Sequence, residues 1–373
     1  MSDFNKLRPV LKVIGLGGAG GNAVNRMSEV GLRDVELIAA NTDAQALERS
    51  QAQVKIQLGA NLTQGLGAGG EPSKGQLAAL DSKEDLREVL HGAHLVFITA
   101  GMGGGTGTGA APVAAQVAKD CGALTIGVVT RPFNFEGMQR GAAAAEGIAQ
   151  LREAVDTLLI VPNDKLIELA GQHMTTAEAF RKADDVLRQA VQSISDVITQ
   201  SGSINMDLND IKAVMTGAGQ ALIGIGEATG RERALEAAQL AVRSPLLENV
   251  TIDGARGLIV NIVGPRAMTM AEMDVIMGFL NKAASPEAKI KMGHVYDDDI
   301  GDRLRVTVIA TGFPPQGAAR THAALGRLTE GGARLAPRGG APVFGPSSAP
   351  RPDEGDLSKP AFMRWPAKVR KLK

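Results

Sequence analysis

Residues Gly101 to Gly109 read Gly-Met-Gly-Gly-Gly-Thr-Gly-Thr-Gly, and this stretch decides the fold class. The apolar run Leu95-Val-Phe-Ile-Thr-Ala100 before it predicts a buried strand, and the alanine-rich pattern from Ala110 to Lys119 after it predicts a helix. A glycine loop between a strand and a helix start exposes backbone N–H groups at the positive end of the helix dipole, which favours a bound anion. The loop has no lysine, so dipoles, a metal ion or an arginine elsewhere must offset the charge of a phosphate.

A second glycine loop lies near the N-terminus and reads Gly15-Leu-Gly-Gly-Ala-Gly-Gly21. It follows a predicted strand, Val10–Leu16, and precedes a helical pattern, Asn22–Val30. Its spacing satisfies the dinucleotide fingerprint Gly-x-Gly-x-x-Gly, for which Asp43 is a late but possible acidic partner, and this leaves an NAD-dependent oxidoreductase open. Two phosphate cradles in one sheet, with a third glycine cluster at Gly65–Gly70, instead favour a nucleotide with several phosphates.

Strand and helix patterns alternate from residue 10 to about residue 170, which predicts a doubly wound, mostly parallel sheet. The candidate strands are Val10–Leu16, Val35–Ala40, Val54–Leu58, Leu95–Ala100, Leu124–Thr130 and Thr157–Val161.

A capping box, Thr175-Thr-Ala-Glu178, predicts the start of a long helix that Gly202 ends. About 26 residues at the usual rise make a rod of roughly 39 Å, long enough to join two domains. The second domain is expected to be mixed α+β. One expected helix begins at Leu208 to Asp210, and two others span Ala234–Val242 and Thr269–Ala284. The expected strands are Gly257–Val263, Ala288–Tyr296 and Arg303–Thr311.

These patterns predict five segments with distinct roles. They are a nucleotide-binding domain at 1–175, a central helix at 176–202, an α+β domain at 203–312, a disordered linker at 313–355 and a tail peptide at 356–373. The linker prediction rests on its content of Pro, Gly, Ala and Arg.

Several motifs together resemble the FtsZ family, the bacterial branch of the tubulin family. The run Gly103-Gly-Gly-Thr-Gly-Thr-Gly109 is similar to the tubulin signature, and the resemblance extends over about residues 8 to 312. The other matching segments are Asn41–Leu47, Pro132–Gly137, Pro162–Leu166, Asn205–Asp210 and Ser244–Glu248. The resemblance implies a tubulin-like fold and a GTP-dependent, self-assembling cytoskeletal GTPase that forms head-to-tail filaments in a division ring.

The resemblance also implies a site for GTP or GDP, with Mg²⁺ held mainly by phosphate oxygens and water. Asp184 is assigned to the guanine edge and Phe180 to its flat face, although dipole complementarity alone could explain an acid near a helix start. Glu136 and Arg140 are spaced to share a helix face, and the resemblance places Glu136 near the ribose and Arg140 near the base or phosphates; a surface ion pair is the alternative. The remaining expected binding residues are Gly17, Gly18, Ala19, Gly20, Gly21, Asn22, Asn25, Gly103, Gly104, Gly105, Thr106, Gly107, Thr108 and Asn163.

The resemblance places catalysis in the segment Asn205-Met-Asp-Leu-Asn-Asp210, at the far end of the long helix. Asn205, Asp207 and Asp210 of one subunit are expected to act on the GTP held by the next, because one molecule cannot easily bring the two places together. A head-to-tail contact that repeats without closure makes a filament. Capping of the following helix is an alternative role for Asp207 or Asp210.

Two places depart from the family pattern. Glu71 stands before Pro72 where the family usually has Asn, so an extra carboxylate lies near the expected γ-phosphate position. The tail keeps Pro360-Ala-Phe-Met-Arg364, which resembles the family's partner-binding peptide, but Ser358-Lys359 replaces the usual Asp-Ile. Residues 356–373 are therefore expected to bind membrane-tethering and regulatory division proteins.

Composition excludes several classes. Forty basic and forty acidic residues balance, and aromatic residues are only 3%, which argues against a specific nucleic-acid partner. Cys121 is the single cysteine, so an internal disulfide framework is excluded. The sequence shows no signal peptide and no membrane span, which predicts a cytoplasmic protein, at the division site by resemblance. A GTP-binding scaffold without hydrolysis stays open beside the NAD-dependent oxidoreductase.

Overall fold

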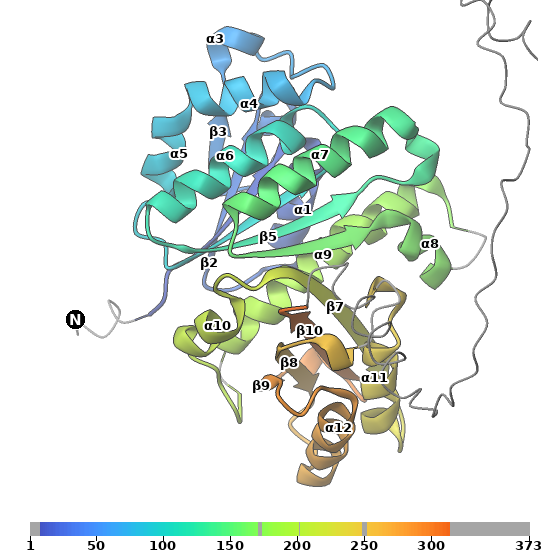
Figure 1. Ribbon diagram of the computed structural model, residues 1–373. Helices are drawn as coiled ribbons and strands as arrows, with labels where there is room; N and C mark the ends of the chain where they lie inside the picture. Colours follow the sequence, from blue (N-terminus) through green and yellow to red (C-terminus); the bar gives the residue numbers. More distant parts are fainter. Residues whose placement is uncertain (1–7, 171–173, 201, 248–251, 314–373) are drawn as a thin grey trace, which may run out of the picture. The chain divides into compact units, whose positions relative to one another are not determined.

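A computed structural model describes residues 8–170, 174–200, 202–247 and 252–313 (Figure 1). Its strands are β1 (Leu11–Leu16), β2 (Val35–Asn41), β3 (Val54–Gln57), β4 (Leu95–Gly101), β5 (Leu124–Arg131), β6 (Thr157–Pro162), β7 (Gly219–Ala228), β8 (Gly257–Gly264), β9 (Lys289–Tyr296) and β10 (Leu304–Thr311). Its α-helices are α1 (Gly17–Val30), α2 (Ala44–Glu48), α3 (Ala60–Thr63), α4 (Pro72–Asp81), α5 (Lys83–Leu90), α6 (Thr106–Asp120), α7 (Met138–Ala154), α8 (Asn163–Ala170), α9 (Thr176–Thr199), α10 (Leu208–Met215), α11 (Arg233–Val242) and α12 (Met270–Ala283).

The described strands form one sheet in the order β3-β2-β1-β4-β5-β6-β7-β10-β8-β9. The first six follow the strand order of dinucleotide-binding folds and pair in parallel. Strand β10 runs antiparallel to β7 and β8, whereas β8 and β9 are parallel, so the C-terminal part is mixed. The predicted doubly wound α/β fold with a mixed second part is therefore confirmed.

Strand β7 is absent from the sequence prediction, yet it joins the two parts of the sheet. It pairs in parallel with β6 at Thr157 to Leu159 and antiparallel with β10. The glycines that break its apolar pattern serve packing, because helix α11 lies directly on the strand. A Cβ at Gly224 would lie 2.0 Å from the Ala241 carbonyl oxygen, and one at Gly226 would lie 2.1 Å from that of Ala237.

Both glycine segments predicted as loops are partly helical. Helix α1 begins at Gly17, five residues before the predicted Asn22, and α6 begins at Thr106, four residues before Ala110. Glycine is required where these helices meet other backbone. A Cβ at Gly109 would lie 1.9 Å from the Pro72 carbonyl oxygen of α4. The open loop of the Gly101–Gly109 motif is therefore shorter than its run of glycines.

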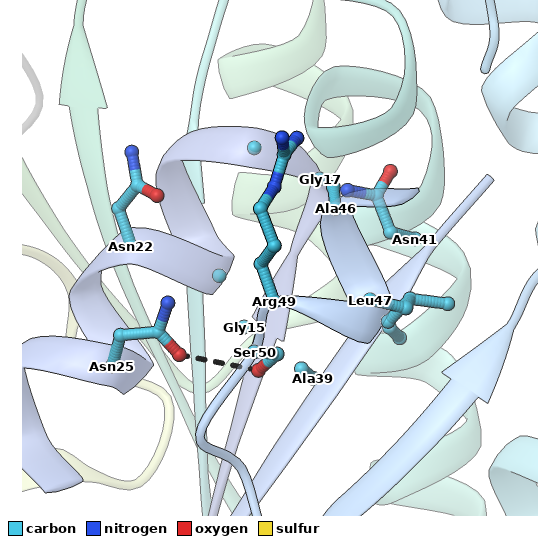
Figure 2. Close-up of a pocket in the computed structure, with 13 residues that line it drawn as sticks. Gly15, Gly17, Asn22, Asn25, Ala39, Asn41, Ala46, Leu47, Arg49 and Ser50 are labelled. Atoms are coloured by element: carbon cyan, nitrogen blue, oxygen red, sulfur yellow. Dashed lines mark hydrogen bonds between the residues drawn. The ribbon is translucent and has the colours of Figure 1, made fainter. Parts of the chain in front are cut away.

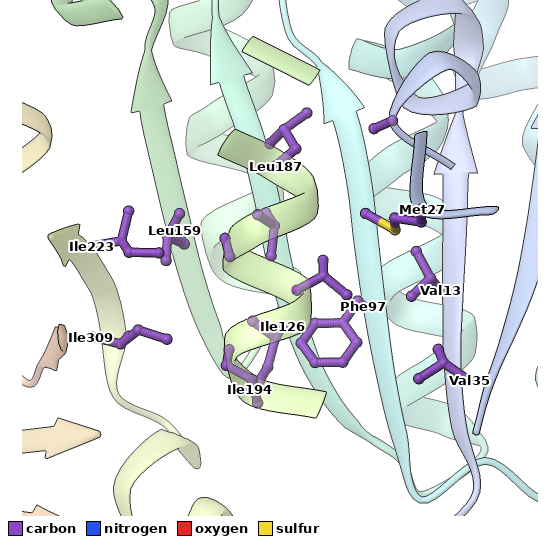
Figure 3. Close-up of a cluster of buried hydrophobic side chains, with 14 of the residues drawn as sticks. Val13, Met27, Val35, Phe97, Ile126, Leu159, Leu187, Ile194, Ile223 and Ile309 are labelled. Carbon is purple, nitrogen blue, oxygen red and sulfur yellow. The ribbon is translucent and has the colours of Figure 1, made fainter. Parts of the chain in front are cut away.

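Helix α9 has the predicted capping box. The Thr175 hydroxyl accepts a hydrogen bond from the Glu178 N–H, and the Glu178 carboxylate accepts one from the Thr175 N–H. The helix has 24 residues and ends at Thr199 rather than at Gly202. Figure 3 shows Leu187 and Ile194 of α9 beside side chains from both parts of the sheet, so the helix supplies core to each.

Helices cover both faces of the N-terminal part of the sheet (Figure 1). Helices α4 to α7 pack on one face, where the apolar cluster includes Ile14, Ile98 and Ala114. Helices α1 and α9 pack on the other, in the cluster that includes Val13, Phe97 and Ile194. Among the described residues, no helix combines the length and the apolar character that crossing a membrane requires. The predicted tail peptide and all but Phe313 of the predicted linker lie outside the described residues.

Candidate functional site

A cleft opens at the carboxyl ends of the N-terminal strands, where folds of this kind bind ligands. Its main part measures about 510 Å³, within the range of small-molecule sites, and is lined by the ends of β1 and β4, the starts of α1 and α6, and α9. Two further hollows adjoin it through shared lining residues. One shares Gly18 and Asn41 with the main part, and the other shares Phe180 and Asp184.

The glycines expected to bind nucleotide fall into two groups. A Cβ on Gly18, Gly21 or Gly104 would meet no atom within 4 Å, and all three residues line the cleft system. By contrast, a Cβ on Gly20 would lie 2.5 Å from the Thr99 carbonyl oxygen, and one on Gly107 would lie 2.9 Å from that of Gly101. The first group leaves room for a ligand to approach the backbone, whereas the second allows helices to pack closely on the sheet.

The two threonines of the Gly101–Gly109 motif also differ in whether they face the cleft or serve packing. The Thr106 hydroxyl lines the cleft and lies 2.6 Å from that of Thr42. The Thr108 hydroxyl is buried and accepts a hydrogen bond of 2.8 Å from the Gly103 N–H. Thr108 therefore shapes the Gly103 turn, whose φ of +97° favours glycine.

The hollow between α1 and α2 contains an arginine that the sequence analysis missed. Figure 2 shows Arg49 extending along the first turn of α1, among residues that line the same hollow. Asn25 lies opposite, and its Oδ1 atom accepts hydrogen bonds from Ser50 Oγ and the Gln51 N–H at 3.2 and 2.7 Å. Asn25 thus anchors the segment after α2, and no local pattern marked Arg49 as part of the cleft.

Helix α9 contributes Phe180 and Asp184 to the other side of the cleft. Phe180 is 42% exposed and meets Phe133 edge to face at 5.3 Å between ring centroids. Burial raises the pKa of Asp184 to about 7, with Asp185 adding to the rise and Arg26 opposing it. A half-buried carboxyl whose pKa lies near 7 is held in its ionised form by a ligand that donates hydrogen bonds to it.

Three further expected residues line the main part of the cleft. Arg140 and Glu136 form the predicted ion pair, and Glu136 also accepts a 2.9 Å hydrogen bond from the Phe133 N–H. The Oδ1 atom of Asn163 is buried and has no hydrogen-bond partner among the described residues. A buried acceptor without a partner is costly, so Asn163 is suited to a donor group on a ligand.

The acidic loop, residues 202–210, lies beyond the other end of α9. Met206 is buried, while Asn205 and Asp207 on either side of it are exposed. Asp207 caps α10 by accepting a 2.8 Å hydrogen bond from the Asp210 N–H. Asn205 Oδ1 accepts a 2.9 Å hydrogen bond from the Gly202 N–H. Asp207 therefore caps α10, which is the alternative role expected for it, and its side chain is still exposed to solvent.

The cleft and the acidic loop are far apart in one molecule. From Asp184 to Thr199 the rise along α9 alone is about 22 Å, and the loop begins after that point. Figure 1 shows α8 and α10 at opposite ends of α9. The structure therefore does not bring Asn205, Asp207 and Asp210 together with the cleft residues of the same chain.

Two protein-family models match this chain, one in the N-terminal part and one in the C-terminal part. The Tubulin/FtsZ family GTPase domain matches residues 10–171, and the C-terminal domain of the FtsZ family matches residues 219–314. The chain belongs to the Tubulin/FtsZ family. It is similar to FtsZ from M. jannaschii in a structure titled an empty dimer, with 42% identity and a TM-score of 0.79, over 84% of this chain and 93% of that one.

A point mutant of the same M. jannaschii protein matches with 42% identity and a TM-score of 0.80, over 83% of this chain and 93% of that one. CetZ2 from Haloferax volcanii, titled a GTPγS-bound protofilament, shares the fold with 18% identity and a TM-score of 0.70, over 86% of this chain and 98% of that one. Within that family, the C-terminal match and the similarity to M. jannaschii FtsZ place the chain in the FtsZ branch.

Proposed function

We propose that this chain binds GTP and GDP in the cleft and hydrolyses GTP only where the acidic loop of one subunit meets the cleft of the next. The separation of the two places along α9 carries the proposal. The cleft has features suited to holding a nucleotide, and the exposed carboxylates of the acidic loop lie out of its reach in the same chain. A repeated head-to-tail contact joins them and builds a filament.

The base side of the proposed site depends on α9. Guanine presents two adjacent donors, N1–H and the 2-amino group, and the ionised Asp184 carboxylate can accept both. Phe180 offers a partly exposed ring for stacking, and the unpartnered Asn163 Oδ1 offers a further acceptor. Glu136 and Arg140 stand at the rim for the ribose and phosphates.

The phosphate side depends on backbone. The open glycines Gly18 and Gly104 let phosphate oxygens approach N–H groups at the starts of α1 and α6. Arg49 supplies the cation that the glycine loops lack. Mg²⁺, which usually keeps several waters in protein sites, is proposed to bind mainly phosphate oxygens and water. Bound Mg²⁺ would offset phosphate charge.

In the shared site, Asp207 and Asp210 orient water toward the γ-phosphate of the neighbouring subunit, and Asn205 supports the loop. The dimer and the protofilament named in the titles of the comparison structures support self-assembly for this chain. A division-ring role and binding of tethering or regulatory proteins through residues 356–373 complete the proposal.

The direct test measures phosphate release per subunit against protein concentration. Turnover is expected to rise steeply above the concentration at which GTP, but not GDP, makes the protein sediment. Asp210→Ala is expected to lose at least 100-fold in turnover while nucleotide binding stays within twofold. Mixing it with Gly104→Asp, which keeps the acidic loop but repels phosphate, should restore part of the activity.

Turnover that does not depend on protein concentration would overturn the shared site. Assembly with GTP but without phosphate release would instead support the non-hydrolysing scaffold. Retention of NAD but not GTP on the purified protein would support the oxidoreductase, although Asp43 caps α2 by accepting from the N–H groups of Gln45 and Ala46.

A further inference from the structure

Strand β9 forms one edge of the sheet, and the acidic loop lies against it. The His294 N–H donates a 2.8 Å hydrogen bond to the Ile204 carbonyl oxygen, and the Ser203 hydroxyl bonds that of Tyr296. A Cβ at Gly202 would lie 1.6 Å from the His294 carbonyl oxygen. The loop therefore covers part of an open strand edge, and the strand fixes the position of the loop.

Lys291, on the same strand, pairs with the acidic loop directly. Its Nζ lies 2.5 Å from Asp210 Oδ1, and the two side chains are 39% and 33% exposed. The hydrogen bond and the charge of Lys291 lower the pKa of Asp210, so the carboxylate stays ionised. The pair therefore presents an anion and a cation together at the surface that the proposed hydrolysis site uses.

The carboxylates of the acidic loop repel the phosphates that they approach, and Lys291 offsets part of this repulsion. Two carboxylates that approach a triphosphate meet charge of their own sign, and repulsion between like charges is stronger where water is excluded. Within the cleft, Arg49 lies beside the first turn of α1 and Arg140 is already paired with Glu136, so neither arrives with the carboxylates of the neighbouring subunit. A cation that travels with Asp210 offsets part of this repulsion.

We propose that Lys291 enters the shared site with Asp210 and places its ammonium group against the terminal phosphate of the nucleotide in the neighbouring subunit. This inference rests on the proposed head-to-tail hydrolysis. The water oxygen forms the new bond to the terminal phosphorus, the bond from that phosphorus to the leaving oxygen of GDP breaks, and the proton of the water passes to the released phosphate. Lys291 exchanges no proton, and it stabilises the charge that spreads over the phosphoryl oxygens.

The test compares Lys291→Met and Lys291→Arg with a matched control, Lys289→Met, which removes the same charge two residues earlier on the same face of β9. Phosphate release is measured in sedimented filaments at saturating GTP. Lys291→Met is expected to lose at least tenfold in turnover, Lys291→Arg to keep at least a third, and Lys289→Met to stay within twofold of the unaltered protein.

A double variant separates direct contact with phosphate from mere positioning of Asp210. If Lys291 contacts the phosphate, Lys291→Met lowers the residual turnover of Asp210→Asn further. If the double variant equals Asp210→Asn, Lys291 acts only through Asp210 and the direct contact is wrong. Turnover of Lys291→Met within twofold of the unaltered protein also overturns the inference.

A mixing experiment keeps the test valid if Lys291→Met assembles poorly by itself. Its cleft is intact, so co-assembly with Gly104→Asp subunits, whose cleft repels phosphate but which carry an intact Lys291, should raise turnover at least fivefold over either variant alone. No recovery in filaments that contain both variants contradicts the inference. Normal turnover in Asp210→Asn, by contrast, contradicts the proposed function itself.

Discussion

The cleft beside the N-terminal half of α9 and the acidic loop beyond its C-terminus are built in opposite ways. The cleft relies on backbone, because glycines bring helix starts close to the sheet and leave N–H groups open. The acidic loop relies on side chains, with Met206 in the core, Asp207 as a cap and Asp210 paired with Lys291. The packed glycines of the cleft, such as Gly20, tolerate no added atoms, whereas a side-chain site is changed by removing charge.

The largest expected effect tests the backbone side of this comparison. Gly20→Val places its Cβ 2.5 Å from the Thr99 carbonyl oxygen, so α1 must move away from β4. We expect a loss of about 3 kcal/mol in the free energy of unfolding. Urea unfolding measures it, with Gly18→Ala as the control, because that Cβ faces open space. Equal stability of the two variants would contradict the division of the glycines into two groups.

A similar loss is expected when a charged contact is removed from the C-terminal part. Arg233 is almost fully buried, and its guanidinium bonds Glu272 and Asp302, each at 2.7 Å. Arg233→Met leaves the partly buried Glu272 carboxylate without its cation, so we expect a loss of about 2–3 kcal/mol. The same urea measurement checks it. The exposed Arg231→Met serves as the control, and an equal loss in both would rule out the proposed role of burial.

A smaller effect is expected for the side chain that is proposed to bind the base. Asp184→Ala should weaken GDP binding by about 2 kcal/mol, roughly 30-fold, because two donors of guanine lose their acceptor. Isothermal titration calorimetry measures the affinity, and Asp185→Ala serves as the neighbouring control. Stability should not fall, because burial disfavours the charge of Asp184 in the free protein. If only Asp185→Ala weakened GDP binding, Asp185 rather than Asp184 would be the carboxylate that recognises the base.

The pKa of Asp184 gives a pH dependence with a defined sign. Burial raises this pKa from 3.8 to about 7, so the folded, ligand-free protein holds the proton more tightly than the unfolded chain. The stability contribution of the protonated form is therefore complete below about pH 4 and is lost as the pH rises to about 7. Binding that needs the ionised form should weaken up to tenfold per pH unit below 7.

Calorimetry of GDP binding between pH 6 and 8 measures this dependence. Asp184→Asn serves as the control, because titration of the phosphates affects both proteins equally. Arg26 on α1 and Asp185 on α9 are the neighbouring charges that shift the midpoint. Parallel pH profiles for the two proteins would show that Asp184 does not bind the ligand in its ionised form.

The smallest expected effect concerns the tail peptide, residues 356–373, which belongs neither to the cleft nor to the acidic loop. Deletion of residues 356–373 should leave GTP turnover within twofold, because the residues proposed for the hydrolysis site lie between Gly15 and Lys291. Phosphate release measures it, and a peptide of the deleted sequence serves as the binding probe for partner proteins. A severe loss of turnover would contradict the separation of hydrolysis from partner binding.

The sequence by itself determined the parts of this protein that depend on neighbouring residues. Alternating apolar runs and turns predicted the parallel strands, and the Thr175–Glu178 capping box marked the start of α9 within one residue. The glycine motifs pointed to the cleft, since a strand followed by glycines and a helix start is a local pattern. The resemblance carried by these motifs led to the family that the comparisons show.

Only the tertiary structure decided which residues meet across long separations. The sequence pattern did not predict strand β7, because Gly224 and Gly226 interrupt its apolar run. These glycines are required by the close approach of the α11 backbone. Arg49 reached the cleft, and Lys291 met Asp210 across 81 positions, through the folding of the sheet. Local periodicity reports which face of an element is buried, but it contains no information on which distant side chain lies opposite.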